Sequence, residues 1–286
     1  MRKILGLLLV ATLFAACNDN DDDAITTSDL TLNLAGLETL GSDYVYEGWI
    51  IVGGNPVSTG TFTSVTFPQT FQVNTDDLNN ATAFVLSIEP AVDPDPAPAP
   101  TKVLRGTFSG NTAAVTTEIV GDFSNAAGEF FLRTPTDETG TNNGNDQYGV
   151  WFGTPGMPPT PNFVLPTLPD GWAYEGWVIG DSGPISTGTF TVFNTMDNGN
   201  PFSGTQNNAG PPIPGEDFFL NAPTGETFPL DIRGRTVVVT VEPVPDDAPT
   251  PFAMKPLLGI AGQDTAPATH AFGQNLGTLP TGTVSR

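Results

Sequence analysis

The sequence predicts an all-β protein of two tandem β-sandwich-like domains that follow a cleaved lipoprotein signal peptide. Charged residues make up only 14% of the 286 residues, whereas glycine and proline number 32 and 28. Good helix formers are scarce after the N-terminal segment, and short apolar runs end at Gly, Pro or Asn turns. The chain also contains a long internal repeat, which predicts two copies of one domain rather than a solenoid.

The N-terminal segment has the pattern of a secretory signal. Two basic residues precede an apolar run over 4–16, and Cys17, the single cysteine, follows. The run is too short to span a bilayer, which needs about 20 apolar residues. Residues 13–17, LFAAC, resemble the bacterial lipobox, which implies cleavage of residues 1–16 and lipidation of Cys17. The alternative is an ordinary cleaved signal with a stray cysteine.

Residues 17–27 are expected to form the lipidated cysteine and an acidic, solvated spacer. The run NDNDDD at 18–23 resembles the export signals of surface lipoproteins of the Bacteroidetes group. We therefore expect lipid anchoring in the outer membrane with exposure at the cell surface. A periplasm-facing orientation is the second choice.

Charge excludes several classes of partner. The chain carries nine basic and 31 acidic residues, for a net charge of −22. Such a chain is repelled by phosphate backbones, so we expect no binding to nucleic acid. Anionic lipid surfaces are excluded for the same reason, and the lipid on Cys17 would be the membrane contact.

The repeat begins with a predicted hairpin. Residues 46–63, YEGWIIVGGNPVSTGTFT, align with 174–191, YEGWVIGDSGPISTGTFT, with twelve of eighteen positions identical. In the first copy, alternating residues over 44–52 predict a strand, Gly-Gly-Asn-Pro at 53–56 predicts a turn, and the following residues predict the returning strand.

A second pair of segments follows each hairpin. Residues 84–90 align with 237–243, and both end in Glu-Pro, where proline stops a central strand. The second copy carries about 25 additional residues within 192–215. We expect independently folding domains at 28–154 and 155–286. They would be joined by a proline-rich seam, the residues GTPGMPPTP at 153–161.

Three segments of each copy resemble, in the same order, the extracytoplasmic C-terminal domain of RskA-type anti-sigma-K factors. They are Tyr46–Ile51, Pro56–Phe62 and Ser87–Pro90, and then Tyr174–Ile179, Pro184–Phe190 and Thr240–Pro243. The resemblance implies a non-catalytic outer module whose ligand is obscure. The sequence lacks the internal transmembrane run and the His/Cys zinc motif of those regulators, so only the outer module is carried over.

Residues that recur in both copies are expected to have structural roles, with the tryptophans buried. They are Tyr46, Trp49 and Glu89, and their counterparts Tyr174, Trp177 and Glu242. Trp151 and Trp172 lie near the seam and are better candidates for exposed aromatic contacts.

Catalytic and metal chemistry has little support. His270 is the single histidine and is expected to be a surface residue. Without a Cys/His cluster no zinc site is expected, and we expect no cofactor. The oxygen-rich loops 137–146 and 197–200 could supply calcium ligands, but neither has EF-hand spacing, so solvated turns are the competing interpretation.

The sequence therefore predicts a non-enzymatic envelope or surface lipoprotein that binds an unknown protein or glycan ligand or has a structural role. One alternative is a sensor accessory of an anti-sigma signalling system. Another is a carboxylate-dependent hydrolase, which needs two unlike carboxylates in one cleft.

Overall fold

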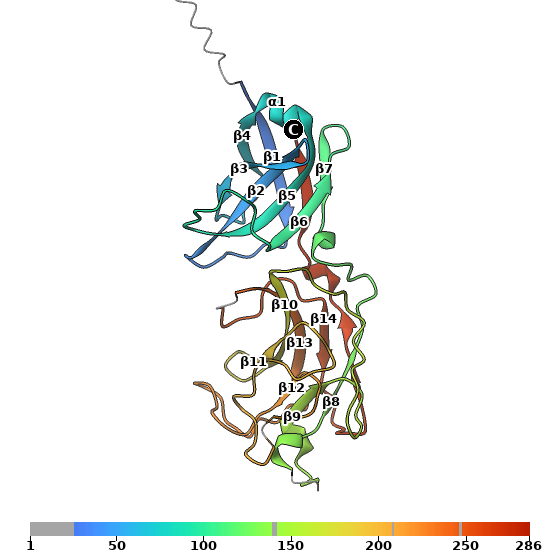
Figure 1. Ribbon diagram of the computed structural model, residues 1–286. Coiled ribbons are helices and arrows are strands. Elements are labelled where there is room, and N and C mark those ends of the chain that lie inside the picture. The colour runs from blue at the N-terminus through green and yellow to red at the C-terminus, as the bar shows by residue number, and fades with distance from the viewer. Residues whose placement is uncertain (1–25, 139–141, 208, 246–247) are drawn as a thin grey trace, which may run out of the picture.

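The computed structural model describes residues 26–138, 142–207, 209–245 and 248–286. Cys17, the expected signal peptide and most of the expected spacer lie outside these residues. The described chain is nearly all β, with four antiparallel sheets arranged as two stacked sandwiches (Figure 1). The described residues include no helix that is both long and apolar enough to cross a membrane.

The first sandwich contains two four-stranded sheets with the orders β4-β1-β17-β7 and β3-β2-β5-β6. A short helix, α1 (Thr75–Asn80), follows β4, and Asn74 caps it by accepting hydrogen bonds from two backbone amides. The strands are β1 (Thr27–Ala35), β2 (Tyr44–Val52), β3 (Asn55–Phe62), β4 (Gln69–Asn74), β5 (Ala81–Pro90), β6 (Lys102–Thr107), β7 (Thr112–Val115) and β17 (Thr281–Ser285).

The second sandwich contains a five-stranded sheet, β11-β10-β13-β14-β16, and a four-stranded sheet, β12-β9-β8-β15. Four single-turn 3₁₀ helices lie in connections: η1 (Thr117–Ile119), η2 (Pro135–Asp137), η3 (Asp146–Tyr148) and η4 (Leu276–Thr278). The strands are β8 (Glu129–Leu132), β9 (Gly149–Phe152), β10 (Trp172–Ile179), β11 (Pro184–Phe190), β12 (Gly215–Asp217), β13 (Thr236–Pro243), β14 (Leu257–Ile260), β15 (His270–Ala271) and β16 (Gly273–Gln274).

The sequence repeat corresponds to one repeated sheet. The hairpin β2–β3 pairs with β5 and then β6, and the hairpin β10–β11 pairs with β13 and then β14. Both hairpins shift register at the same place, between Gly48 and Trp49 and between Gly176 and Trp177. A Cβ on Gly48 would meet Thr59 Oγ1 at 2.5 Å, which explains why this position is glycine.

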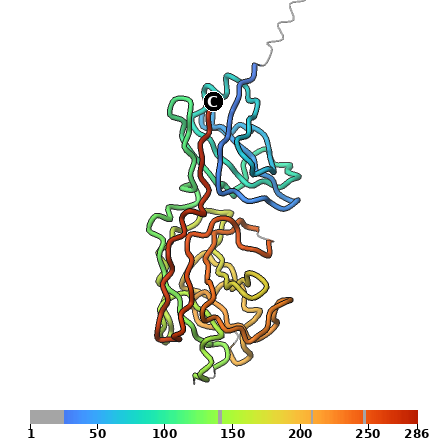
Figure 2. The backbone as a smooth tube through the Cα atoms, turned by 180° about the vertical axis from the view of Figure 1, so that it is seen from behind, coloured from blue at the N-terminus to red at the C-terminus, as the bar shows by residue number. Residues whose placement is uncertain are grey.

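The strand pairing does not follow the expected boundary between 154 and 155. β8 and β9 precede that boundary, but they pair with β15 and β12 of the second sandwich. β17, at the C-terminal end of the sequence, returns to the first sandwich and lies between β1 and β7, as the tube in Figure 2 shows. Pairing between distant segments leaves no trace in local periodicity, which is why the sequence left open to which half the strands within 107–152 belong.

The expected independence of the two domains also conflicts with the packing. Buried apolar side chains of both sandwiches form one connected cluster, from Leu32 and Phe84 in the first to Val239 and Phe252 in the second. The chain also crosses between the sandwiches twice, after β7 and before β17. The fold is therefore two sandwiches with a shared core and a returning C-terminal strand.

Candidate functional site

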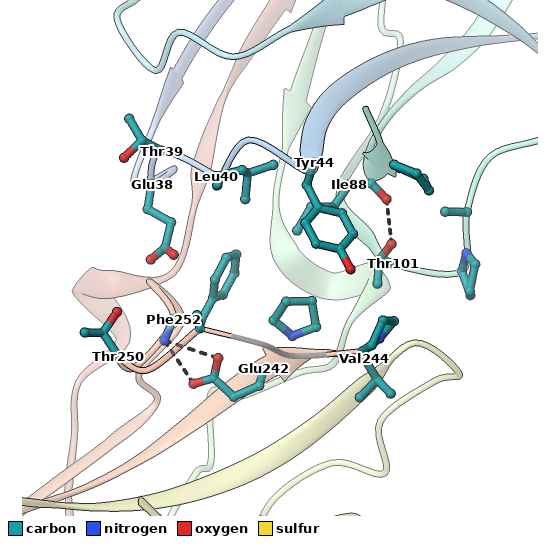
Figure 3. Close-up of a pocket in the computed structure, with 17 residues that line it drawn as sticks. Glu38, Thr39, Leu40, Tyr44, Ile88, Thr101, Glu242, Val244, Thr250 and Phe252 are labelled. Atoms are coloured by element: carbon teal, nitrogen blue, oxygen red, sulfur yellow. Dashed lines mark hydrogen bonds between the residues drawn. The ribbon is translucent and has the colours of Figure 1, made fainter. Parts of the chain in front are cut away.

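A pocket of about 350 Å³ lies between the two sandwiches (Figure 3). Three segments line it: 38–44, which leads into β2, and two proline-containing segments, 88–101 and 242–252. The last two are the ends of the Glu-Pro strands and the loops that follow them, one from each copy. The repeat thus builds both walls of the pocket from the same element.

Most of the pocket surface is apolar. Tyr44 projects from the start of β2 into the space above Phe252, with Leu40 and Ile88 beside it (Figure 3). Prolines add rigid apolar surface from both loops: Pro90, Pro100, Pro243 and Pro245. The polar groups include the Glu38 carboxylate and the hydroxyls of threonines at the edges. This composition is typical of a binding pocket for an apolar or aromatic group.

Two buried glutamates hold the loops in place. Glu89, 1% exposed, accepts hydrogen bonds from the Ala99 amide at 2.8 and 3.1 Å, and Glu242, also 1% exposed, accepts from the Phe252 amide at 2.9 and 3.2 Å. Each bond closes the loop ten residues after the carboxylate. Burial raises the pKa of Glu89, partly offset by hydrogen bonds from Ser87 and Ala99.

Two lysines bind the same loops through backbone carbonyl groups. Lys102 Nζ donates to the Ala99 carbonyl at 2.9 Å, and Lys255 Nζ donates to the carbonyls of Pro251, at 3.1 Å, and Phe252. Burial lowers the pKa of Lys255, while Glu38 and Glu242 act in the opposite direction. The loop geometry is therefore fixed by a Glu and a Lys at equivalent positions of the two copies.

The recurrent tryptophans lie outside the apolar core cluster, although they are buried. Trp49 and Trp177 are 4% and 2% exposed and face the side of their sheets opposite Tyr46 and Tyr174. Trp49 Nε1 donates to Ser87 Oγ at 2.8 Å, and Ser87 Oγ in turn donates to Glu89. This chain of hydrogen bonds connects the hairpin to the loop that lines the pocket.

The recurrent tyrosines face the core and are fully buried. Tyr46 OH donates to the Glu38 carbonyl at 2.9 Å, and Tyr174 OH donates to the Pro166 carbonyl at 2.6 Å, eight residues upstream in both cases. Burial raises the pKa of both phenols. Tyr46 thereby fixes the segment that carries Glu38 at the pocket wall.

A second polar region in the described chain is a group of buried carboxylates in the second sandwich. Asp217, fully buried, accepts hydrogen bonds from Thr136 N at 2.7 Å, Thr136 Oγ1 at 2.6 Å and Trp151 Nε1 at 2.8 Å. Burial raises the pKa of Asp217 to about 8, and those of Glu216 and Asp197 to about 7. Sequence reasoning missed Glu216 and Asp217, because nothing in the local pattern separates them from solvated acidic residues.

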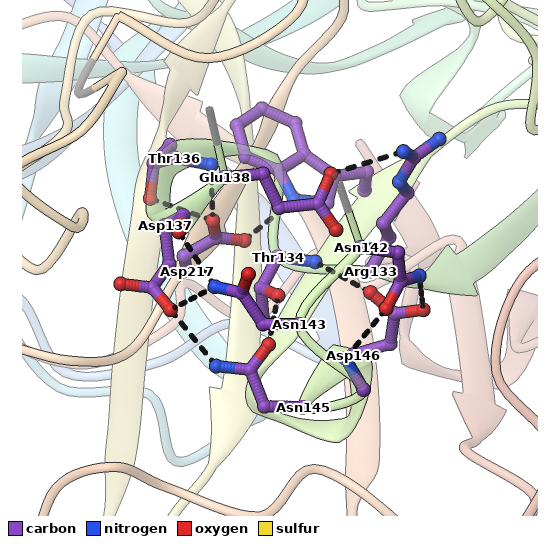
Figure 4. Close-up of polar contacts among 12 residues, drawn as sticks. Arg133, Thr134, Thr136, Asp137, Glu138, Asn142, Asn143, Asn145, Asp146 and Asp217 are labelled. Carbon is purple, nitrogen blue, oxygen red and sulfur yellow. Dashed lines mark hydrogen bonds and ion pairs between the residues drawn. The ribbon is translucent and has the colours of Figure 1, made fainter. Parts of the chain in front are cut away.

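In the described part of the oxygen-rich loop at 137–146, several side-chain amides and carboxylates bond to other side chains of the protein (Figure 4). Asn143 and Asn145 donate to the Asp137 carboxylate at 3.0 and 2.9 Å, and Glu138 pairs with Arg133 at 3.0 Å. Within the described parts of the chain, which exclude 139–141, no group of three or more His, Cys, Asp or Glu residues is placed to hold a metal ion.

Two expected exposed aromatics are buried, so that expectation was wrong. Trp151 and Trp172 are 2% and 3% exposed, because β9 and β10 place them inside the second sandwich instead of beside an extended proline-rich seam. His270 packs against Phe130 at 5.3 Å between ring centroids. Its Nδ1 accepts from the Gly262 amide at 3.2 Å, and Nε2 lies 3.0 Å from the Asp264 carbonyl, so both ring nitrogens have structural partners.

The comparisons with known proteins concern the first copy. Residues 23–104 match the family model described as anti-sigma-K factor rskA, C-terminal, which covers under a third of the chain. No curated protein and no solved structure matched the chain. The matched range includes β1 to β5 and part of β6, so it contains the hairpin, the Glu-Pro strand and one wall of the pocket. The resemblance stated from the sequence is confirmed here: residues 23–104 match the C-terminal domain family of anti-sigma-K factors.

Proposed function

We propose that the protein is a non-enzymatic envelope lipoprotein whose extracytoplasmic part binds a ligand in the pocket between the two sandwiches. The main observation that supports this proposal is the pocket itself. At about 350 Å³ it lies in the usual size range of ligand pockets, and its surface is largely apolar with a few polar groups at the edge. Its two facing walls come from equivalent loops, so one ligand contacts both copies at once.

The arrangement of polar groups supports binding over catalysis. Glu89 and Glu242 are engaged by backbone amides of their own loops, and His270 has structural partners on both ring nitrogens. A carboxylate-dependent hydrolase needs an acid and a second carboxylate facing one cleft. The pocket offers Glu38 at its wall, whereas Glu242 is almost completely buried.

A neutral, apolar fluorophore such as N-phenyl-1-naphthylamine tests the pocket directly. We expect saturable binding to the mature chain, with a fluorescence increase as the dye leaves water. Leu40→Asn places a polar amide in the pocket wall and should weaken binding about tenfold. Leu220→Asn, on a half-exposed leucine outside the pocket, is the control and should bind as the wild type does. Equal binding by both variants and the wild type would place the dye elsewhere and remove the support for this site.

The anchor is a separate part of the proposal. Cys17 is the single cysteine and follows the lipobox-like residues, and the acidic run after it supports a surface-exposed position in the outer membrane. Cys17→Ser should abolish labelling with a fatty-acid probe and release the protein from membranes. A mutant that remains labelled would disprove lipidation at this residue.

The family match favours one second candidate, a sensor accessory of an anti-sigma signalling system. Residues 23–104 match a domain named for an anti-sigma factor. In this function the pocket ligand would be the signal received by a separate membrane regulator. Deletion of the gene should then change expression of genes that depend on one sigma factor, and unchanged expression with and without the pocket ligand would exclude this candidate.

A further inference from the structure

Each sandwich also has a concave site on the outer side of its repeated hairpin. The first, of about 370 Å³, includes Glu47, Ser58 and Thr61 in its lining. The second, of about 560 Å³, includes the equivalent residues Glu175, Ser186 and Thr189. In both, the serine hydroxyl donates a hydrogen bond to the glutamate carboxylate. We call these the first and second outer pockets.

Each outer pocket adjoins the pocket between the sandwiches at shared lining residues. Pro90 lines both the first outer pocket and the central pocket. Val244, Pro245 and Ala248 line both the second outer pocket and the central pocket. The three pockets therefore lie next to one another along both proline-containing loops, from one copy to the other, and we call them together the groove.

Polarity changes along the groove. The centre is apolar, while the first outer pocket adds the carboxylates of Glu47, Asp93 and Asp95, and the second adds Glu175. No ion pair within the described part of the chain involves Glu47, Asp93 or Asp95. The chain as a whole carries a net charge of −22, which attracts cations and repels anions. Charge complementarity thus selects an occupant that is apolar in its middle and positively charged towards its ends, most strongly in the first outer pocket, because Glu175 is only 5% exposed.

The sheet edges beside the outer pockets suit an extended chain. β3 and β11 are the terminal strands of their sheets, and each contributes residues to the outer pocket beside it. A terminal strand presents backbone donors and acceptors to an added strand, which is a common mode of peptide recognition.

We propose that this groove binds an extended polypeptide segment, with apolar side chains in the central pocket and lysine or arginine side chains in the outer pockets. This inference rests on the proposed function and specifies its ligand class. The carboxylates at the two ends would fix the peptide across both copies, and the apolar centre would supply most of the buried surface. The duplicated sandwich then serves as one bivalent receptor for a basic peptide.

The test uses the mature chain and a labelled synthetic peptide, KKLVPLVKK, measured by fluorescence anisotropy. Val244, 48% exposed, lies where the central and second outer pockets join, so Val244→Lys should weaken binding about tenfold or more. Val192, 49% exposed and outside the three pockets, gives the matched control Val192→Lys, which adds the same charge and should leave the affinity unchanged. Both sites are exposed, so neither variant should impair folding.

Two double variants test the acidic residues of the first outer pocket. Asp93→Asn with Asp95→Asn should weaken binding about threefold to tenfold and reduce its dependence on salt. Glu118→Gln with Asp264→Asn removes the same charge from exposed positions away from the groove and should have no effect. Replacing the lysines of the peptide by glutamates should abolish binding, and replacing its centre by Gly-Ser residues should weaken it strongly.

The inference is overturned if Val244→Lys binds the peptide as Val192→Lys does, or if the glutamate peptide binds equally well. Selective binding of a neutral oligosaccharide or of lipid vesicles in place of the peptide would also overturn it. If N-phenyl-1-naphthylamine binds the central pocket but the peptide does not bind, the proposed function stands and this inference falls. If neither binds, both fall.

Discussion

The two copies build the same sheet but complete their sandwiches differently. In the first copy, the repeated sheet packs against β4-β1-β17-β7, in which β17 comes from the C-terminal end of the sequence and the other three strands lie before, within and after the copy. In the second copy, the partner sheet is β12-β9-β8-β15, whose strands come from the linker before the copy, from its insertion and from its end. The repeated segments therefore specify one sheet and its loop, and the partner sheet is recruited from sequence that is not repeated.

The two sandwiches also differ in how many carboxylates they bury. Glu89 is the one fully buried carboxylate that the described residues of the first sandwich contain. The second sandwich buries several, including Glu216 and Asp217, at the end of the additional segment 192–215.

The returning strand gives the largest effect. Deleting residues 281–286 removes β17 from between β1 and β7, together with the fully buried Val284. We expect the first sandwich to lose cooperative folding, because its sheet loses a central strand and two strands acquire unpaired edges. Hydrogen exchange should show lost protection in β1 and β7 and retained protection in β9 and β13.

Arg286→Ala is the control for this deletion, because it keeps β17 and removes only the side-chain bonds. Arg286 donates to the carbonyls of Leu78 at 2.5 Å and Ala81 at 2.8 Å, and its guanidinium lies 4.4 Å from the Phe108 ring centroid. Loss of these contacts should cost about 1–3 kcal/mol. Equal protection in the deletion and in this control would show that the first sandwich does not need β17.

The tryptophans give the second effect and test the equivalence of the copies. Trp49→Ala and Trp177→Ala should each lower the free energy of unfolding by about 3 kcal/mol, the lower end for large buried aromatics, because both are buried but lie outside the apolar core cluster. Urea denaturation measures the loss. A loss below about 1 kcal/mol at one site together with impaired peptide binding would instead identify that tryptophan as a ligand contact.

The buried carboxylates give the third effect, a pH dependence located in the second sandwich. Because burial raises the pKa of Asp217 to about 8 and that of Glu216 to about 7, the folded state holds protons that the unfolded state has released. Their contribution to stability is fully present below about pH 4 and is lost as the pH rises to about 8. Asp217→Asn should flatten the change in unfolding free energy between pH 5 and pH 8, and an unchanged slope would assign the effect to other groups.

The tyrosine hydroxyls give the smallest effect. Tyr46→Phe and Tyr174→Phe each remove one hydrogen bond to a carbonyl eight residues upstream, so each should cost about 1 kcal/mol. Tyr46→Phe should in addition loosen the segment that carries Glu38, and it should weaken binding of the apolar dye while Tyr174→Phe leaves it unchanged. Equal effects on the dye would show that the Tyr46 hydroxyl does not position the pocket wall.

The sequence allowed the all-β class, the repeated hairpins and the Glu-Pro strands to be predicted, because each depends on local alternation and turn residues. It did not allow the partner sheets to be predicted, since the pairing of β17 with β1 depends on contacts across the whole chain. The pocket was missed for a related reason. Glu89 and Glu242 were identified as structural, but the meeting of their loops across the two sandwiches has no local signal.

The place of β17 has a mechanical consequence for a lipid-anchored chain. The start of β1 and the end of β17 lie at the same end of the first sandwich, away from the second sandwich (Figure 1). An anchor before β1 would put the first sandwich next to the membrane and the second farther out. A ligand pulling on the groove would then load β1 along its length, against hydrogen bonds to β4 and β17 that must shear together. The strand that closes the fold would also be the strand that resists force at the membrane.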